Sequence, residues 1–512
     1  MSRSDAPGAG GIAAYWKRIF KAATHYASPA LIAAAAVLAI SAAALFVKPY
    51  VGMADNGDYF RILYSNGIYF NATDYAGQYF GYFIKHYGIF QYFNENGATL
   101  SSSQSLFVRL ALRLNIWFLD ARTFDIRIQA AIYLILYTVA VYMLVEALTW
   151  KAPAKRGYAI AAIAVFIFGD TAYTAYFNSF YSEALMLIMS LFVLASGLLI
   201  YRRRFNDYAM LAVFVISSLL LVTSKQQNAP LGILIALFGI FVLLARSDRR
   251  YRISAAGGLT LLLAVSIASY VLIPQEFVNI NKYHAMTRGV LPDSGDPEQS
   301  LESMGIDRQY SLLSGSIYYE PYTTIDVNSN KMLTEFYGKF GFGKVLAYYA
   351  THPDQAIRML NLAAKGAFTT RPETMGNYEK SEGLAFGAQT HFFSLYSVLK
   401  KALTPKTFGF IFLWTIVVIG LYMPSFVSAV RTKNRRQAVR LPLLLTMILL
   451  GLAGIAISIV GAGDADLAKH EFMFTIVFDL VTFMTVSDAL LGRLWRNVPL
   501  RPDTAPAATT AA

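Results

Sequence analysis

Long apolar runs constrain the fold of this chain more than any other feature of its sequence. A helix rises about 1.5 Å per residue, so roughly 20 apolar residues cross the hydrocarbon core of a bilayer. Runs near this length occupy residues 29–47, 126–149, 157–170, 180–201, 207–223, 229–245, 253–273, 408–429, 440–461 and 470–490. The sequence therefore predicts an all-α polytopic membrane protein with about ten transmembrane helices.

The composition excludes several other classes of protein. Hydrophobic residues make up 56% of the 512 residues, which exceeds what a soluble core requires. The formal net charge is +13, but the basic residues occur in short runs between apolar stretches, so we expect no nucleic-acid partner. There is no cysteine, which excludes disulfides, thiolate metal ligands and thiol nucleophiles.

Basic residues predict how the spans are oriented. If the N-terminus is cytoplasmic, the cytoplasmic loops contain nearly all of the Lys and Arg residues close to the spans, as the positive-inside rule requires. These residues are Lys17, Arg18, Lys151, Lys155, Arg156, Arg202, Arg203, Arg204, Arg246, Arg249, Arg250, those between 431 and 440, Arg493 and Arg496. The short outer loops then hold only Lys225 and Lys469. We expect a multi-pass inner-membrane protein with both termini in the cytoplasm.

This topology leaves two long segments outside the membrane, at 48–125 and 274–407. The first carries amphipathic stretches such as 106–119, which predict helices lying along the outer interface. The second is more polar and predicts a small periplasmic subdomain. The expected organisation is a cytoplasmic leader at 1–28, a seven-span bundle at 29–273, the subdomain at 274–407, three spans at 408–490 and a cytoplasmic tail at 491–512. The Ala42-Ala43-Ala44 string resembles a cleavage site, but the length of the first run favours a retained anchor.

A pair of carboxylates follows the first span, in Asp55-Asn56-Gly57-Asp58, with Arg61 close behind. Two acids three positions apart, a glycine that permits a tight turn and a neighbouring cation can hold and orient a general base. The alternative is a simple helix cap, in which one Asp accepts backbone N–H groups. A cap needs one Asp and not two, so we expect Asp55 or Asp58 to be catalytic and Arg61 to contact a phosphate.

Two more outer loops carry candidate residues. Glu183 lies at the start of an apolar helix, where it is either a catalytic carboxylate or a favourable negative charge in the first helical turn. Asp170 and Asn178 precede it and are candidate substrate contacts. Lys225, next to Gln226, opposes the positive-inside pattern, which favours a phosphate contact over ordinary snorkelling to the interface. Gln226 is a further candidate substrate contact.

The last outer loop holds two acids, a lysine and a histidine within eight residues. Lys469 and His470 suit a phosphate, whereas Asp464 and Asp466 suit sugar hydroxyls or a divalent ion. A coincidental polar loop is the alternative. In the second long segment, Arg371 and Asn377 are candidate acceptor contacts, although exposed charge is ordinary in a soluble loop. Together these loops predict a polar site that faces outward and adjoins lipid.

These features resemble the GT-C class of membrane glycosyltransferases. The resemblance rests on the acidic motif after the first span, the amphipathic outer segment and the later periplasmic region. The strings Asp55-Asn56-Gly57-Asp58, Asn178-Ser179-Phe180-Tyr181-Ser182-Glu183 and Asp466-Leu467-Ala468-Lys469-His470 are similar to those of bacterial glycan-biosynthesis hexose transferases of the WsfD type.

The resemblance implies an inverting transfer of a hexose from a polyprenyl-phosphate-linked donor to a glycan, lipid or protein acceptor at the periplasmic face of the bacterial inner membrane. The acid of the family motif corresponds to Asp58 or Asp55. No cofactor is implied and a divalent metal is optional, because polyprenyl phosphate is already a workable leaving group.

Two other functions stay open. An O-antigen polymerase or ligase would depend on arginines of the outer segments, such as Arg371 and Arg288. A lipid-linked-sugar transporter or flippase would need charged or helix-breaking positions near the middle of the bilayer. The spans offer few such positions, with Pro424 near one end, and Asp479 and Glu146 are the two acids without an evident role.

Overall fold

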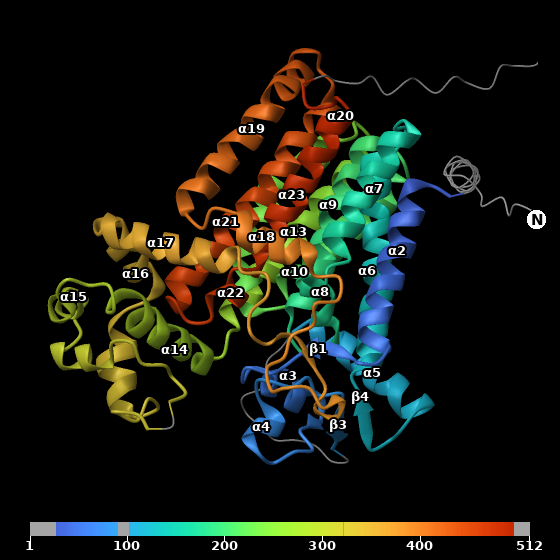
Figure 1. The fold of residues 1–512 in the computed structure, drawn as a ribbon. Helices are drawn as coiled ribbons and strands as arrows, with labels where there is room; N and C mark the ends of the chain where they lie inside the picture. Colours follow the sequence, from blue (N-terminus) through green and yellow to red (C-terminus); the bar gives the residue numbers. More distant parts are fainter. Residues whose placement is uncertain (1–26, 91–101, 321, 496–512) are drawn as a thin grey trace, which may run out of the picture.

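The computed structural model describes residues 27–90, 102–320 and 322–495. Long helices form a bundle, and shorter elements gather at one end of it (Figure 1). The predicted leader at 1–28 and tail at 491–512 lie almost entirely outside the described residues.

Eight helices in the described ranges are long and apolar enough to cross a membrane. They are α2 (Pro29–Phe46), α6 (Arg127–Thr149), α9 (Glu183–Arg202), the helix Gln226–Leu244, α13 (Arg249–Val271), α19 (Phe408–Arg431), the helix Arg435–Ala462 and α23 (Phe472–Leu490). The helix Gln226–Leu244 combines η3 (Gln226–Asn228), α11 (Ala229–Phe238) and α12 (Phe241–Leu244). The helix Arg435–Ala462 combines α20 (Arg435–Ala438) and α21 (Arg440–Ala462). The predicted all-α polytopic fold is confirmed.

Two of the ten predicted spans depart from a full-length helix. The span expected at 157–170 corresponds to α7 (Ala154–Phe168), but the loop expected after it is helical, with α8 (Thr171–Thr174) and η2 (Ala175–Asn178) following α7 at an angle of 52°. Asp170 starts the second part by accepting the backbone N–H of Ala172. The span expected at 207–223 is α10 (Asp207–Val222), whose 16 residues make it shorter than the bilayer core.

The first outer segment combines short helices with small sheets. Its helices are α3 (Phe60–Leu63), η1 (Tyr64–Asn66), α4 (Tyr75–Gln78) and α5 (Gln104–Phe118). The amphipathic helix expected at 106–119 is α5, and Leu106, Leu110 and Trp117 are exposed along it. A three-stranded antiparallel sheet of β2 (Ile68–Tyr69), β3 (His86–Ile89) and β4 (Thr123–Asp125) was not predicted. Strands of two to four residues are too short to give a readable alternating pattern.

The second outer segment has a core of its own that also packs on the bundle. Its elements are α14 (Gln275–His284), η4 (Ala285–Val290), α15 (Pro297–Ser303), η5 (Arg308–Leu313), η6 (Met332–Phe336), η7 (Tyr337–Lys339), α16 (Phe342–Thr351), α17 (Pro353–Ala367), β5 (Met375–Tyr378), η8 (Lys380–Glu382) and α18 (Leu395–Leu403). Met286, Met332 and Phe336 are buried in this core together with Ile455 of α21 and Phe474 of α23. Strand β5 pairs antiparallel with β1 (Val51–Met53), which joins the two outer segments just before Asp55.

The acids that had no evident role in the sequence are paired inside the bundle. Asp479 of α23 accepts a hydrogen bond at 2.5 Å from Lys400 of α18, and the Tyr173 hydroxyl also donates to it. Glu146 of α6 forms an ion pair at 2.6 Å with Arg204. Charges in a membrane protein are costly unless paired, so these contacts give both acids a structural role. They weaken the transporter alternative.

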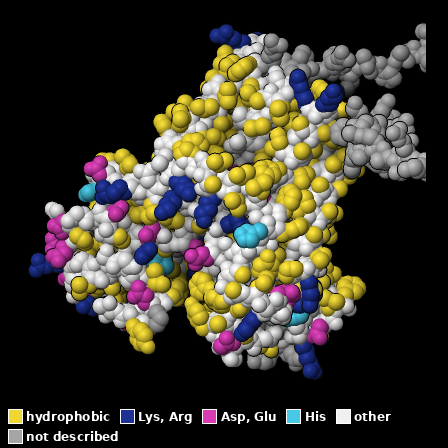
Figure 2. All heavy atoms as spheres, viewed as in Figure 1, with side chains coloured by type: hydrophobic (Ala, Val, Ile, Leu, Met, Phe, Trp, Pro, Cys, Tyr) yellow, Lys and Arg dark blue, Asp and Glu magenta, His cyan; other side chains and the backbone are white. Residues whose placement is uncertain are grey.

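Charge is distributed unevenly along the bundle. In the view of Figure 2, Lys and Arg side chains without visible acidic neighbours lie at the upper end of the bundle, whereas acidic and basic side chains are mixed over the lower part and the outer segments. Apolar side chains cover the helices between the two ends. This distribution agrees with the sequence-based division into two groups of loops.

Candidate functional site

The turn that follows β1 is built by Asp55. Its Oδ1 atom accepts the backbone N–H groups of Gly57, Asp58 and Tyr59, at 2.8, 2.9 and 3.1 Å. Gly57 has a φ of +104°, a conformation that favours glycine. Asp55 is buried and does not line the adjacent cavity, whereas Asp58 does. The two acids of the motif are therefore different in kind, with Asp55 shaping the turn that presents Asp58.

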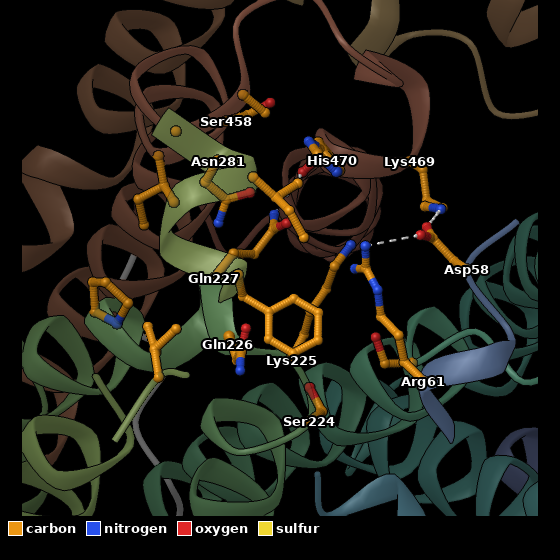
Figure 3. A pocket seen from close by; sticks show the side chains of 18 of the residues that line it. Asp58, Arg61, Ser224, Lys225, Gln226, Gln227, Asn281, Ser458, Lys469 and His470 are labelled. Atoms are coloured by element: carbon orange, nitrogen blue, oxygen red, sulfur yellow. Dashed lines mark hydrogen bonds and ion pairs between the residues drawn. The ribbon is translucent and has the colours of Figure 1, made fainter. Parts of the chain in front are cut away.

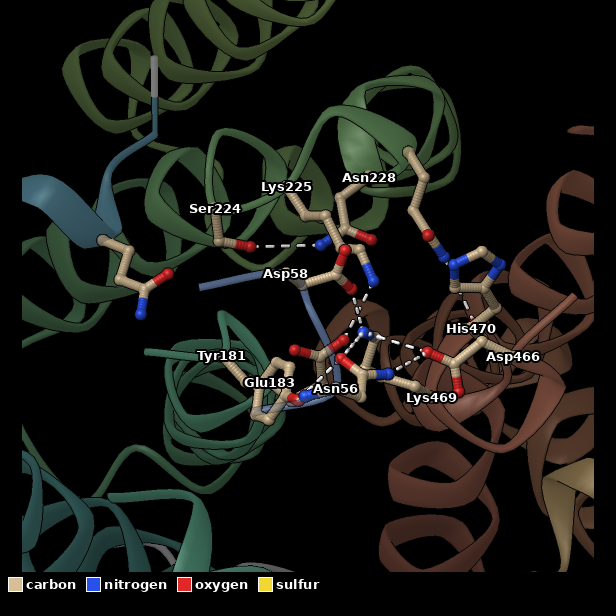
Figure 4. A network of polar contacts seen from close by, with 12 residues as sticks. Asn56, Asp58, Tyr181, Glu183, Ser224, Lys225, Asn228, Asp466, Lys469 and His470 are labelled. Atoms are coloured by element: carbon tan, nitrogen blue, oxygen red, sulfur yellow. Dashed lines mark hydrogen bonds and ion pairs between the residues drawn. The ribbon is translucent and has the colours of Figure 1, made fainter. Parts of the chain in front are cut away.

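Asp58 joins the first outer loop to the last one, 411 positions away. Its carboxylate forms a close ion pair with Lys469 of α22 (Leu467–His470), as Figure 4 shows. Arg61 lies 3.5 Å from the same carboxylate. Lys469 also contacts Asp466 at 3.0 Å and the Asn56 side-chain oxygen at 3.2 Å. Lys469 is thus the centre of a network that fixes the acidic motif against the C-terminal part of the bundle.

Electrostatics keep the charged pair ionised. Burial raises the pKa of Asp58, but Lys469 and Arg61 outweigh it and hold that pKa well below its usual range. Burial lowers the pKa of Lys469, but Asp466 and Asp58 outweigh it and raise that pKa above its usual range. Burial, with Lys225 nearby, lowers the pKa of His470 to about 3. His470 is therefore neutral at pH 7 and contributes a hydrogen-bonding ring to the site, and no charge.

Two residues of this network were not among the predicted site residues. The Asn56 backbone N–H donates to the Tyr181 hydroxyl at 2.8 Å, and that hydroxyl donates to the Asn56 side-chain oxygen at 2.7 Å. The Asn56 amide also donates to Asp466 at 2.7 Å, and the Lys469 ammonium lies 4.7 Å from the centre of the Tyr181 ring. Both residues lie inside the motifs that carry the acids, and this position is the signal that could have identified them.

Glu183 and Lys225 form a second ion pair beside the first. Lys225 Nζ lies 2.9 Å from Glu183 Oε1, which joins the start of α9 to the loop before α11. Glu183 is buried, whereas the Lys225 side chain keeps 20% of its exposure. This pairing neutralises part of the Lys225 charge. The Glu183 side chain is 1% exposed, whereas that of Asp58 is 33% exposed and therefore more accessible to a substrate.

These side chains open onto a cavity of about 380 Å³ (Figure 3). Its polar end is formed by Asp58, Arg61, Glu183, Lys225, Lys469 and their neighbours Gln226, Gln227 and His470. Its remaining wall is mainly apolar and includes Ile62, Phe180, Pro230, Tyr270, Ile273, Phe277, Ile280, Phe342, Leu346, Ile457 and Val460. Gln104, Ser182, Ser224, Asn281 and Ser458 add uncharged polar side chains to the same lining. The spacing of Ile273, Phe277 and Ile280 on α14 and the preceding turn is the helical pattern that could have revealed this wall. A cavity with cations at one end and apolar side chains along its wall suits an amphiphilic anion.

Asp170 and Arg371 lie away from this cavity. Asp170 is fully buried and accepts the Ser397 backbone N–H at 2.9 Å. Arg371 donates to the Thr171 hydroxyl at 2.9 Å and to the Thr390 carbonyl at 2.6 Å. Both residues attach the second outer segment to the break between α7 and α8, and neither is included in the proposed site.

Three more predicted substrate contacts also make structural hydrogen bonds. The Asn178 amide donates to the Val51 carbonyl at 2.8 Å, and the Asn377 amide donates to the Glu373 carbonyl at 3.3 Å. Asp464 pairs with Arg288 at 2.7 Å. None of the three lines the cavity. Their role in substrate binding stays a prediction from the sequence.

The described residues contain no group of three or more His, Asp or Glu side chains placed to hold a metal ion. Lys469 contacts two acids, Asp58, which lines the cavity, and Asp466, which does not. A lysine already supplies there the positive charge that a metal would bring.

Comparison with protein families places almost the whole chain in one of them. The model of the YfdI N-terminal transmembrane domain matches residues 16–507. The chain belongs to this family. The match agrees with a multi-pass membrane protein, and it does not test the similarity to hexose transferases of the WsfD type.

A search of curated proteins gave no match to this YfdI-family chain. Among solved structures, an archaeal oligosaccharyltransferase, AglB from Archaeoglobus fulgidus in complex with an inhibitory peptide and a dolichol-phosphate, is similar over 90% of this chain and 50% of its own. The identity is 13% and the TM-score 0.33, and the YfdI-family chain spans about half the length of that protein. A likeness this distant carries no argument about function.

The buried Asp55 carboxylate makes the stability of this YfdI-family chain depend on pH. Burial raises its pKa to about 7, above the usual value near 4, so the folded state holds this proton more tightly than the unfolded state. Its contribution to stability is therefore greatest at low pH and is lost as the pH rises from about 4 to about 7, at up to roughly 1.4 kcal/mol per pH unit. Asp55→Asn keeps the Oδ1 acceptor and cannot ionise, so we expect its melting temperature in detergent to exceed that of wild type at pH 8 and not at pH 4. Equal melting temperatures at pH 8 would contradict this.

Proposed function

We propose that this chain is a membrane glycosyltransferase of the GT-C type that transfers a hexose from a polyprenyl-phosphate-linked donor to a glycan or lipid-linked acceptor, with inversion. One observation carries the proposal: an ionised acid, Asp58, shares a cavity with the three cations Arg61, Lys225 and Lys469, and much of the remaining wall of that cavity is apolar. An acid, a phosphate-binding set of cations and a wall for a lipid chain are the parts that this reaction needs.

The cations are placed to hold the donor phosphate. Arg61, Lys225 and Lys469 reach the polar end of the cavity from three different loops, so they can surround one phosphodiester. The first part of the polyprenyl chain would lie against Ile280 and Phe277. As the bond between the anomeric carbon and the phosphate oxygen breaks, negative charge grows on the phosphate, and these cations stabilise it.

Asp58 is the proposed general base. The acceptor hydroxyl attacks the anomeric carbon from the side opposite the phosphate, and its proton passes to the Asp58 carboxylate. In the free protein Lys469 keeps this carboxylate a weak base. A bound phosphate competes for Lys469, so we propose that donor binding weakens the Lys469–Asp58 pair and makes Asp58 more basic. Gln226, at the same end of the cavity, is a candidate for sugar hydroxyls.

Glu183 and Asp55 receive other roles in this proposal. Glu183 positions Lys225 through their ion pair, and it is the next candidate for the base. Asp55 positions Asp58 through the turn. Neither role requires Glu183 or Asp55 to touch the substrate.

We propose that the cavity faces the periplasm and that both termini are cytoplasmic, in a bacterial inner membrane. The support is the distribution of basic residues, because the basic turn at α20 lies at the opposite end of the bundle from α22, which carries Lys469 of the cavity (Figure 1). The donor would then be made on one side of the membrane and used on the other.

Specific contacts favour transfer over the two alternatives. Arg371 and Arg288, on which a polymerase or ligase would depend, are engaged by Thr390 and Asp464 and do not line the cavity. Asp479, the acid in the middle of a span, is paired with Lys400. This pairing gives Asp479 a structural role that does not require transport.

The experiment is transfer from radiolabelled polyprenyl-phosphate hexoses to membrane glycans by the purified, reconstituted full chain. We expect labelled product from at least one hexose donor, and none from the corresponding nucleotide sugar alone. If no donor yields a glycosidic bond while labelled lipid crosses the vesicle membrane, the chain is a transporter and the proposal is wrong.

A further inference from the structure

A second cavity, of about 960 Å³, lies among the loops that contain most of the basic residues. Its lining comes from the ends of α6 and α9, the loop between α12 and α13, and the turn between α19 and α20. The described residues that line it are Trp150, Lys151, Arg202, Arg203, Leu244, Ala245, Arg246, Ser247, Asp248, Lys433, Asn434, Arg435 and Arg436. Seven of these thirteen are Lys or Arg and one is an acid, so the cavity is strongly positive.

Only part of this positive charge is balanced by the protein. Arg436 and Arg246 form ion pairs with the same acid, Asp207, at 2.6 and 3.4 Å, and Arg202 lies 3.7 Å from Asp488. The other four basic side chains have no acidic partner in the part of the chain that the structure describes. They are Lys151, Arg203, Lys433 and Arg435, all exposed.

Three of these four residues have a strained backbone conformation. Lys151, Arg203 and Lys433 have φ angles of 57°, 53° and 53°, in the left-handed region. Each lies at the end of a helix, where glycine or asparagine normally takes this conformation because other side chains strain it. The positive-inside rule requires basic residues in these loops, but it requires neither this conformation nor their convergence on one cavity.

We propose that this second cavity binds a phosphate group. Guanidinium and ammonium groups from four loops would surround the phosphate oxygens, and the anion would offset the mutual repulsion of the unpaired cations. The phosphate belongs either to the headgroup of an anionic phospholipid or to a soluble phosphate compound, and both share the chemistry that the cavity recognises. This inference does not depend on the transfer reaction, because the site contains no residue of the first cavity.

The test uses the purified full chain and two probes. The lipid arm measures retention of phosphatidylglycerol against phosphatidylcholine by native mass spectrometry, and the soluble arm measures binding of inorganic pyrophosphate by calorimetry. The variant R203Q/K433Q/R435Q removes three unpaired charges while keeping side chains of similar length. The matched control, R249Q/R250Q/R431Q, removes three exposed charges from neighbouring helix ends that do not line the cavity.

We expect one of the two probes to bind the wild type and to lose about a hundredfold in affinity in R203Q/K433Q/R435Q, roughly fivefold for each charge removed. The control should lose less than about fivefold. Preference for phosphatidylglycerol identifies a lipid headgroup, and binding of pyrophosphate identifies a soluble compound. Binding of neither probe, or equal losses in the two triple variants, overturns the proposal. If the triple variant does not fold, Arg435→Gln alone, which has ordinary backbone geometry, should still lose about fivefold.

Discussion

Asp58→Asn is expected to lower kcat for hexose transfer by about 10²- to 10⁴-fold, the range in which a general base contributes. The amide has nearly the same shape as the carboxylate and keeps an oxygen that can accept from Lys469, so the loop should stay in place. It cannot accept the acceptor's proton. The loss should therefore appear in kcat, with the KM for the donor changed far less.

The measurement is initial-rate transfer at equal amounts of folded protein, with two companion variants. Asp55→Asn should retain activity within about tenfold, because it alters the acid that shapes the turn and keeps the turn's Oδ1 acceptor. Asp120→Asn, an exposed acid of the same outer segment, should behave as wild type. Full activity in Asp58→Asn combined with loss in Glu183→Gln would move the base to Glu183 and refute the assignment.

The membrane architecture could be predicted from the sequence because its cause is local. A run of apolar residues such as 126–149 is sufficient to specify a span, since a helix in lipid satisfies its own backbone. The break at Asp170 was missed for the same reason. In the sequence, a single polar residue such as Asp170 at the end of an apolar run indicates only that the helix ends there. The hydrogen bonds of Asp170 to Ala172 and Ser397 show that a second helix follows after a bend.

The candidate site could be predicted only in part. The acids after the first span and the lysines of the later loops were expected to share one face, and the structure brings Asp58, Lys225 and Lys469 to one cavity. Spacing along the chain gave no way to separate Asp58 from Asp55, because the difference is burial and hydrogen bonding. Arg371 and Asn377 were expected at the site because they are polar, but each is engaged by backbone carbonyls elsewhere.

Both cavities follow from one property of the sequence. Loops that alternate between the two ends of a bundle converge in two groups, and each group brings together side chains that are far apart in the chain. Asp58 and Lys469 meet at one end, and Arg203 and Lys433 meet at the other. In the proposals above, Asp58 of the first cavity takes up a proton, whereas the second cavity, with seven basic residues and one acid on its lining, binds an anion.

Lys469→Met is expected to raise the KM for the donor by about 10- to 100-fold, the effect of removing one charge-assisted contact to a phosphate. It should also shift the pH dependence of kcat. In the wild type Lys469 holds the pKa of Asp58 low, so protonation of the base does not limit transfer near neutral pH. Without Lys469 the pKa of Asp58 rises, and activity should begin to fall at a higher pH as the solution is acidified.

Stability provides a separate readout for the same variant. Removing Lys469 leaves Asp58 and Asp466 without their shared cation, at a cost of about 1 to 3 kcal/mol, which is less than for a fully buried pair because both acids are a third or more exposed. The double variant D58N/K469M should recover part of this stability and none of the donor binding. Lys365→Met, an exposed lysine on α17, is the matched control and should change neither quantity. If Lys469→Met weakens folding but leaves the donor KM and the pH profile unchanged, Lys469 is only a structural cation, and the phosphate must bind to Arg61 and Lys225 without it.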